Sequence, residues 1–256
     1  MKINKHPKEF RILYLCGDLS LIGGIEKYNR DFLSAIELTG AKAKVVERKV
    51  GGFINKVSFL FRSLFFIISF LPNHIICAHI HFSPIVLLSN RLFRFNFSLS
   101  LYGIEAIEIN NPVYRSAVNN AKKIIVISEY TKNLVNSQFY FPDDKFFMLI
   151  SSVDSQSNSL MENPLKLKKK YSFENNLIIL TISRLSATEE KGQHRVIQAC
   201  IELIKKFPNA KYIMAGPGSD ERVEKVLNEN PYGIPVIERE EAYRSAIKKL
   251  YHHYEK

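Results

Sequence analysis

The chain has 256 residues, 46% of them hydrophobic and 24% charged, and its net charge is +11. These values exclude a disordered or fibrous chain and leave room for one large or two modest globular domains. The positive charge predicts an acidic partner, either nucleic acid, an anionic membrane or a phosphorylated small molecule. No nucleic-acid partner is expected, because no RNP-like or zinc-finger spacing occurs.

The cysteine pattern and the N-terminus bear on the compartment. Cys16, Cys77 and Cys200 each lie in an apolar stretch without a CxxC spacing. We expect reduced, buried thiols of a cytoplasmic protein and no metal site. The first ten residues lack an apolar signal core, so secretion is not expected.

The N-terminal half alternates strand and helix patterns. A strand over 11–16 is followed by a glycine loop and by a helix that begins at Ile25 and ends at Gly40. Ser128 is the expected N-cap of a helix over 129–139. Further strands are predicted over 43–50, 74–81, 97–103, 122–128 and 145–154. This alternation is typical of a parallel, doubly wound α/β sheet.

The apolar segment from Val57 to Leu71 has two interpretations. It lies between Lys56 and Pro72 and is shorter than the roughly 20 residues that span a bilayer. It is either a helix packed into the protein or a helix that dips into a membrane surface, helped by the positive charge. The second interpretation would place a cytoplasmic protein at the inner face of the membrane.

A polar stretch over 155–164 predicts a domain boundary. We therefore expect a Rossmann-like domain over 1–155, a linker over 156–172 with a solvated lysine run, and an incomplete Rossmann-like domain over 173–256. In this second domain we predict strands over 176–183, 210–216 and 234–238. Helices are predicted over 221–229 and over 239–256. A further helix is predicted after the loop that follows the first strand, with one apolar face formed by Val196, Cys200, Leu203, Ile204 and Phe207.

Three glycine or basic segments are candidates for binding an anion. Gly17, Gly23 and Gly24 fit neither GxGxxG nor a Walker motif, yet a glycine pair at a helix start exposes N–H groups to an anion. Arg184 and Lys191 follow a strand and would suit a diphosphate. Gly216 and Gly218 could let a ligand approach the backbone. The alternatives are tight turns and solvated surface charges.

An ordered set of segments resembles a known family. These are "GGIEKYNRDF" (23–32), "YGIE" (102–105), "AKKIIVISEYT" (121–131), "SSVD" (151–154), "ISRLSATEEKG" (182–192) and "FPNAKYIMAGPG" (207–218). Over residues 11–237 the set resembles the retaining glycosyltransferases of the two-Rossmann B-type fold, the family-four group. Such enzymes move a sugar from a nucleotide-diphosphate donor to a hydroxyl acceptor, for example on surface polysaccharide or a lipid-linked sugar.

The resemblance implies roles for individual residues. Arg184 and Lys191 would neutralise the diphosphate leaving group, with no metal or other cofactor required. Gly23, Gly24, Gly216 and Gly218 would line the donor-phosphate cleft. Tyr102, Glu105 and Ser128 would lie on the acceptor side.

Two departures from the family pattern predict weak or absent transfer. Tyr102 stands where the family has a histidine, and His79 and His81, on an earlier predicted strand, could approach the cleft or be structural. Glu221 and Glu229 have the spacing of the family's donor-sugar glutamates but lie on the wrong helix, so we expect solvated charges and a truncated donor segment.

Two other readings stay open. One is a non-catalytic binding module derived from such an enzyme, and the other is an unrelated nucleotide-binding protein. A short second sheet with an uncovered edge would also favour self-association.

Overall fold

The computed structural model describes residues 10–21, 23–93, 95–152, 168–169, 172–183, 185–186, 192–215, 218–219, 221 and 225. The chain divides into two compact units, Met1–Val153 and Asp154–Lys256. The two units are treated separately below. The domain boundary expected at residue 155 lies close to this division.

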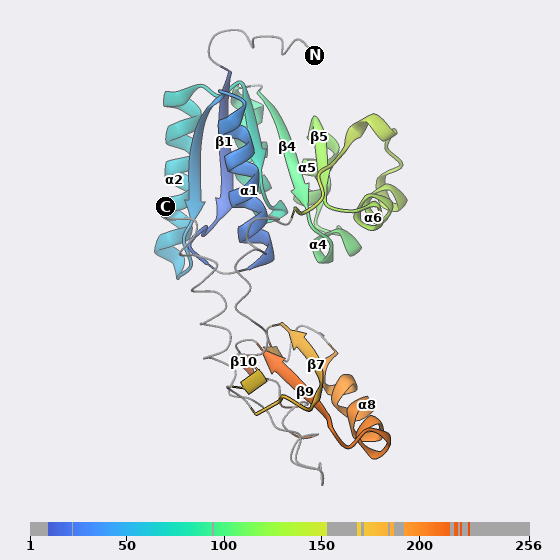
Figure 1. Cartoon of the computed structure of the whole chain (residues 1–256). Coiled ribbons are helices and arrows are strands. Elements are labelled where there is room, and N and C mark those ends of the chain that lie inside the picture. Colours follow the sequence, from blue (N-terminus) through green and yellow to red (C-terminus); the bar gives the residue numbers. More distant parts are fainter. Residues whose placement is uncertain are drawn as a thin grey trace, which may run out of the picture. The chain divides into compact units, whose positions relative to one another are not determined.

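Unit 1 is built on a parallel sheet, as the alternating pattern predicts (Figure 1). Its strands lie in the order β2-β1-β3-β4-β5-β6, and each pairs in parallel with its neighbours. The strands are β1 (Arg11–Gly17), β2 (Lys42–Arg48), β3 (His74–Cys77), β4 (Asn96–Leu101), β5 (Lys123–Val126) and β6 (Phe146–Met148).

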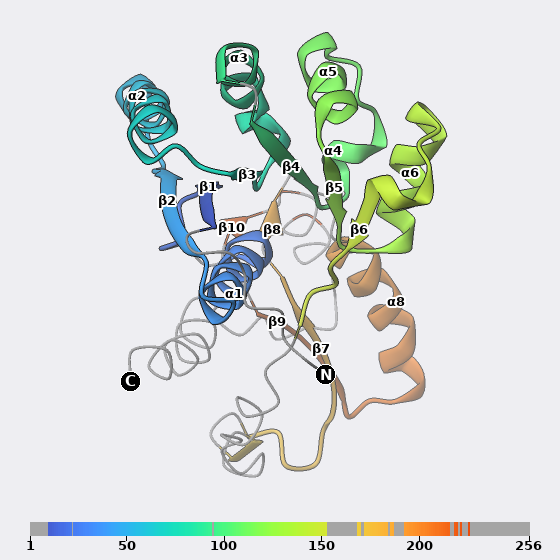
Figure 2. The ribbon, with the colours of Figure 1, turned by 90° about the horizontal axis from the view of Figure 1, so that it is seen from above.

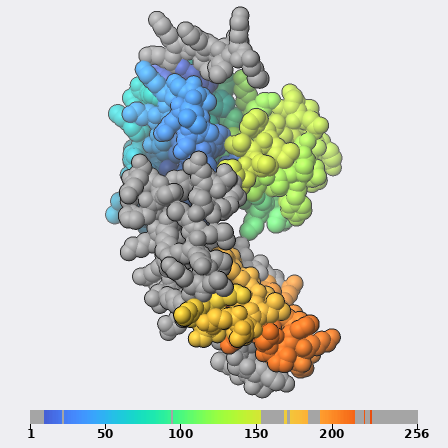
Figure 3. Space-filling view, in the orientation of Figure 1, coloured from blue at the N-terminus to red at the C-terminus, as the bar shows by residue number. Residues whose placement is uncertain are grey.

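Helices cover both faces of this sheet. They are α1 (Gly24–Leu38), α2 (Phe53–Phe70), α3 (Ser83–Phe93), α4 (Ile104–Ile107), α5 (Pro112–Asn120) and α6 (Glu129–Phe139), with short 3₁₀ turns η1 (Ile80–Phe82) and η2 (Asp143–Lys145). Because β2 and β3 flank β1 on opposite sides, right-handed crossovers send α1 and α2 to opposite faces. Figure 2 shows α2, α3 and α5 on one face and α1 on the other, and Figure 3 shows α1 (blue) at the surface.

Alternate residues of the central strands enter two different cores. On the α2 face, Leu13 and Leu15 pack with Phe59 and other apolar residues. On the α1 face, Tyr14 packs with Ile36 in a smaller cluster. This period of two is the pattern expected for a sheet that is buried on both faces.

The three cysteines are buried and free, as their apolar surroundings predict. Burial raises the pKa of the Cys16 and Cys77 thiols to about 12, so both stay protonated at neutral pH. They act as small apolar side chains of the sheet.

Several predicted element boundaries need correction. The strand predicted over 74–81 ends at Cys77, and His79 caps η1 because its Nδ1 accepts a hydrogen bond from the His81 amide. The strand predicted over 145–154 covers only Phe146–Met148. The prediction for Ser128 is confirmed, since its Oγ accepts the Thr131 amide at 3.2 Å and caps α6.

The described part of unit 2 is one strand–helix–strand unit with a short parallel pair beside it. It comprises β7 (Leu177–Ile182), β8 (Leu185–Ser186), α8 (Gln193–Lys206), β9 (Ala210–Ala215) and β10 (Gly218–Ser219). β7 pairs with β9 and β8 with β10, in parallel. Ile197, Cys200, Tyr212 and Met214 form its core. Phe207, predicted on the buried face of the helix, instead follows α8 and is 49% exposed.

Candidate functional site

The topology of unit 1 places a binding site at one edge of its sheet. In a doubly wound sheet, ligands bind at the carboxyl ends of the strands, where the chain order reverses. Here this switch point lies between β1 and β3, because their crossover helices leave to opposite faces. A pocket of about 210 Å³ opens at that point, which we call the switch-point pocket. Its lining residues are Gly17, Ile25, Glu26, Asn29, Arg48, Ala78, His79, His81 and Phe82.

A second pocket of about 370 Å³ adjoins the first, since Arg48, His81 and Phe82 line both. The other residues that line the second pocket are Lys56, Phe59, Ile85 and Tyr114. No Asp or Glu is among the described residues that line this second pocket. Two permanent cations and a histidine therefore give it a positive potential that suits an acidic ligand group.

His79 is the most chemically defined group of the switch-point pocket. Its Nδ1 accepts a hydrogen bond from the backbone N–H of His81 at 3.2 Å. Burial lowers its pKa, and the nearby charges of His81 and Arg48 act in the same direction, against Glu105. The imidazole is therefore neutral at physiological pH, and since Nδ1 is the acceptor, Nε2 carries the proton. His79 can donate one hydrogen bond to a ligand without carrying charge.

Asn29 is held in place by two tyrosines. Its side chain is buried, and its Oδ1 accepts hydrogen bonds from Tyr14 Oη at 2.7 Å and Tyr102 Oη at 2.9 Å. The ring of Tyr102 also stacks on His79, with 6.3 Å between centroids. Burial raises the pKa of Tyr102, so its hydroxyl stays protonated and serves as a donor to Asn29. Tyr102 thus positions Asn29 and His79.

The Glu26 carboxylate lies close to the glycine pair Gly23 and Gly24. Gly23 is the N-cap of α1, and a Cβ placed there would collide with Glu26 Oε2. The Glu26 carboxylate therefore lies beside the start of α1, where a carboxylate satisfies the helix dipole. An anionic ligand placed there would be repelled by Glu26. Gly23 is extended, with φ −175°, and Gly24 is the first residue of α1, so neither adopts a conformation that requires glycine, and the phosphate-binding role of the pair stays a prediction.

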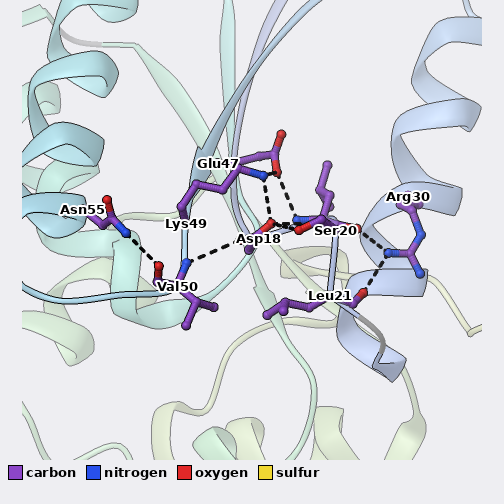
Figure 4. Close-up of polar contacts among 9 residues, drawn as sticks. Asp18, Ser20, Leu21, Arg30, Glu47, Lys49, Val50 and Asn55 are labelled. Atoms are coloured by element: carbon purple, nitrogen blue, oxygen red, sulfur yellow. Dashed lines mark hydrogen bonds and ion pairs between the residues drawn. The ribbon is translucent and has the colours of Figure 1, made fainter. Parts of the chain in front are cut away.

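A polar network fixes the loop that follows β1 (Figure 4). The Asp18 carboxylate accepts hydrogen bonds from Ser20 Oγ at 2.6 Å and from Lys49 Nζ at 2.8 Å. Lys49 also contacts Glu47 at 2.7 Å. The Lys49 and Ser20 contacts hold the pKa of Asp18 well below its usual range. On the other side, Arg30 donates to the carbonyls of Leu19 and Leu21.

The other predicted residues of unit 1 have structural contacts. Glu105 accepts a hydrogen bond from the Tyr102 amide and lies in the first turn of the short helix α4, near the pocket. Ser128 is the N-cap of α6, and its Oγ contacts Thr131 Oγ1 at 3.1 Å. Asn29, Glu26 and Arg48 were missed in the sequence. Arg48 had one available signal, since it lies near the end of the strand predicted over 43–50 and so near the sheet edge that binds ligands.

The predicted donor residues of unit 2 fall mostly outside the described residues. Arg184, Lys191, Gly216 and Glu229 belong to this group, as do most of the linker, the strand predicted over 234–238 and the helix predicted over 239–256. Gly218 lies in β10, which pairs with β8. Next to the predicted cations, Gln193 Nε2 donates to Ser183 Oγ at 2.5 Å and joins the start of α8 to the end of β7.

Comparison with known sequences gives one curated relative of weak similarity. No protein-family model matches the chain. An uncharacterized glycosyltransferase of Methanocaldococcus jannaschii is 27% identical over 118 residues, which make up 45% of this chain and 28% of that protein. The match thus spans little more than a quarter of the curated relative.

Comparison with solved structures identifies the fold. Anabaena HepE in complex with UDP and glucose superposes with a TM-score of 0.65 at 18% identity, over 94% of this chain and 71% of HepE. The UDP-GlcNAc 2-epimerase of M. jannaschii superposes with a TM-score of 0.58 at 11% identity, over 93% of this chain and 76% of the epimerase. The chain therefore has the Rossmann-like architecture of the GT-B fold.

Proposed function

We propose that the chain is of the glycosyltransferase class that moves a sugar from a nucleoside-diphosphate donor to a hydroxyl acceptor, with weak transfer by this chain alone, as the departures from the family pattern predict. The observation that carries the proposal is the switch-point pocket, where neutral His79, fixed Asn29 and the Arg48 cation line one cavity. Hydrogen-bond donors of this kind suit sugar hydroxyls. The curated relative, named a glycosyltransferase, and the likeness to UDP-bound HepE support the same class.

In this proposal the two units bind different substrates. Unit 1 receives the acceptor in the switch-point pocket, and the adjoining cationic pocket takes an acidic group of that acceptor, such as a phosphate or a uronate. In unit 2, Arg184 and Lys191 neutralise the donor diphosphate as it leaves, without a metal ion. Transfer with retention, as in the family-four group, completes the proposal.

The first test is calorimetric titration of the full chain with UDP, GDP and their sugar conjugates. Arg184→Ala and Lys191→Ala are each expected to weaken nucleotide binding about ten- to a hundredfold, because each removes a charged hydrogen-bond donor. Lys206→Ala is the matched control, since Lys206 is an exposed lysine at the end of α8. Failure of every nucleotide to bind would favour a non-catalytic module.

The second test concerns the pocket of unit 1. With a nucleotide sugar that binds, turnover is followed by NMR in the presence and absence of saccharide acceptors. His79→Gln is expected to lower transfer about a hundredfold, whereas His74→Gln at the opposite end of β3 leaves it unchanged at pH 7.5. Acceptor-independent conversion of UDP-GlcNAc at C2 would overturn the proposal in favour of an epimerase.

A further inference from the structure

Helix α2 has an apolar side that the fold of unit 1 does not cover. Its inner side packs on the sheet through Phe59 and Ile67, which are 3% and 2% exposed. Its outer side carries Ile54, Phe61, Phe65 and Ile68, which are 57–81% exposed. These positions are seven, four and three residues apart, so they share one side of the helix. A helix on the surface of a soluble domain normally has polar residues on that side.

The uncovered apolar surface continues onto α3. This helix contacts α2 and lies beside it on the same face of the sheet (Figure 2). Val86 of α3 enters the core, while Leu88 and Leu92 are 55% and 71% exposed. We call the combined surface the α2–α3 apolar face, formed by Ile54, Phe61, Phe65, Ile68, Leu88 and Leu92.

The charges around this face have a single sign. Exposed Arg62 of α2 and exposed Arg91 of α3 border it. The sequence contains no Asp or Glu at all between Glu47 and Glu105, which includes both helices. An apolar surface bordered only by cations matches the chemistry of an anionic lipid bilayer.

Two other roles of α2, a membrane-spanning helix and a dimer interface, fit the observations less well. By length and composition α2 could cross a membrane, but Phe59 and Ile67 are part of the sheet core, which a spanning helix would leave uncovered. A symmetric dimer through the same face would bring two sets of cations together with no acidic partner on these helices.

We propose that the α2–α3 apolar face docks in the plane of an anionic membrane. The phenylalanines enter the boundary between headgroups and acyl chains, and Arg62 and Arg91 lie at the level of the lipid phosphates. The proposal resolves the two interpretations of the apolar segment, because α2 packs into the protein on one side and contacts lipid on the other. It does not depend on the proposed transferase activity.

The test is flotation of the full chain with vesicles of phosphatidylcholine, with and without about 30 mol% phosphatidylglycerol. We expect binding to the anionic vesicles. Phe61→Glu/Phe65→Glu should reduce the partition coefficient more than about a hundredfold, because two aromatic side chains that would enter the bilayer are lost. Arg62→Gln/Arg91→Gln should reduce it about thirtyfold, an effect that disappears on neutral vesicles.

Leu38→Glu is the matched control, because Leu38 is 90% exposed at the end of α1 on the other face of the sheet. It should leave binding unchanged. Amide exchange of β1 and β3 verifies that unit 1 of each variant is folded, and amide exchange of β7 and β9 verifies that unit 2 is intact. Absence of vesicle binding by the wild type would overturn the proposal. So would a wild-type dimer in light scattering that Phe61→Glu/Phe65→Glu converts to a monomer without any change in vesicle binding.

Discussion

The two faces of the unit 1 sheet are covered by helices of opposite character. On one face, α1 exposes a charged surface to solvent, and Lys27 and Asp31 form an ion pair there, one turn apart. The core beneath α1 contains polar groups, including the buried Tyr14–Asn29 hydrogen bond. On the other face, α2 is apolar toward the sheet and also toward solvent, where Phe65 is 61% exposed.

This difference shows which apolar surface the folding of unit 1 requires and which it does not. A crossover helix needs one apolar stripe to cover its sheet, and α1 meets that need with the rest of its surface polar. The second apolar side of α2 adds nothing to the stability of unit 1, because it contacts no other part of the described chain closely enough to be buried. Its chemistry therefore points to a partner outside the unit.

The largest expected effect is a difference in stability between substitutions on the two sides of α2. Phe59→Ala removes a buried aromatic ring and is expected to destabilise unit 1 by about 3–5 kcal/mol. Phe65→Ala on the outer side should change stability by no more than about 0.5 kcal/mol. Native-state amide exchange of β1 and β3 in urea measures both, and it is suited to this chain because the sequence has no tryptophan. Equal losses would show that the outer side is covered within the unit.

The stability of unit 1 should fall in acid because of the titration of His74. Its Nε2 lies 2.9 Å from Ser98 Oγ, and burial, assisted by Lys122, lowers its pKa to about 4. Between about pH 6.5 and pH 4 the unfolded chain binds a proton that the folded chain does not, so stability falls as the pH falls.

His74→Gln keeps a polar partner for Ser98 and removes this titration. Relative to wild type, its stability should improve as the pH is lowered, by up to about 3 kcal/mol near pH 4. Urea titrations at a series of pH values measure the difference. A difference independent of pH would contradict the assignment.

A smaller loss is expected at the loop after β1. Asp18→Ala leaves Ser20, Lys49 and the Val50 amide without their acceptor and should cost about 1–3 kcal/mol at pH 7. Because the folded pKa of Asp18 is depressed, its contribution is present above the ordinary pKa of about 3.9 and is lost below it. The gap between variant and wild type should therefore narrow in acid, and a constant gap from pH 7 to pH 3 would refute this origin.

The order of strands and helices could be read from the sequence because it depends on local patterns. Apolar runs such as those over 11–16 and 122–128 have the length of buried strands rather than of helices, and the helical spacing after Ile25 gives α1. The ends of elements were harder to predict. His79 looked like part of a strand, yet its side chain accepts the His81 amide and starts a 3₁₀ turn.

The candidate site was only partly accessible to sequence reasoning. Tyr102 and Glu105 were found through a short motif, and both lie near the switch-point pocket. Asn29 was not found because nothing in its neighbours along the chain marks it, and Arg48 was not found although it lies near the end of a predicted strand. Their importance comes from the ends of β1, β2 and β3, which meet only when the sheet forms.

The sequence by itself determined the alternating α/β architecture, the buried thiols and the excess of positive charge, because periodicity and composition act locally. Tertiary structure alone decided which side of each element meets water. The apolar pattern of α2 is nearly continuous around the helix, so only its packing on β1 and β2 reveals that Phe59 is inside while Phe61 and Phe65 are outside. Strand order likewise decided where the pocket opens, since hydrogen bonds between strands join residues far apart in the chain.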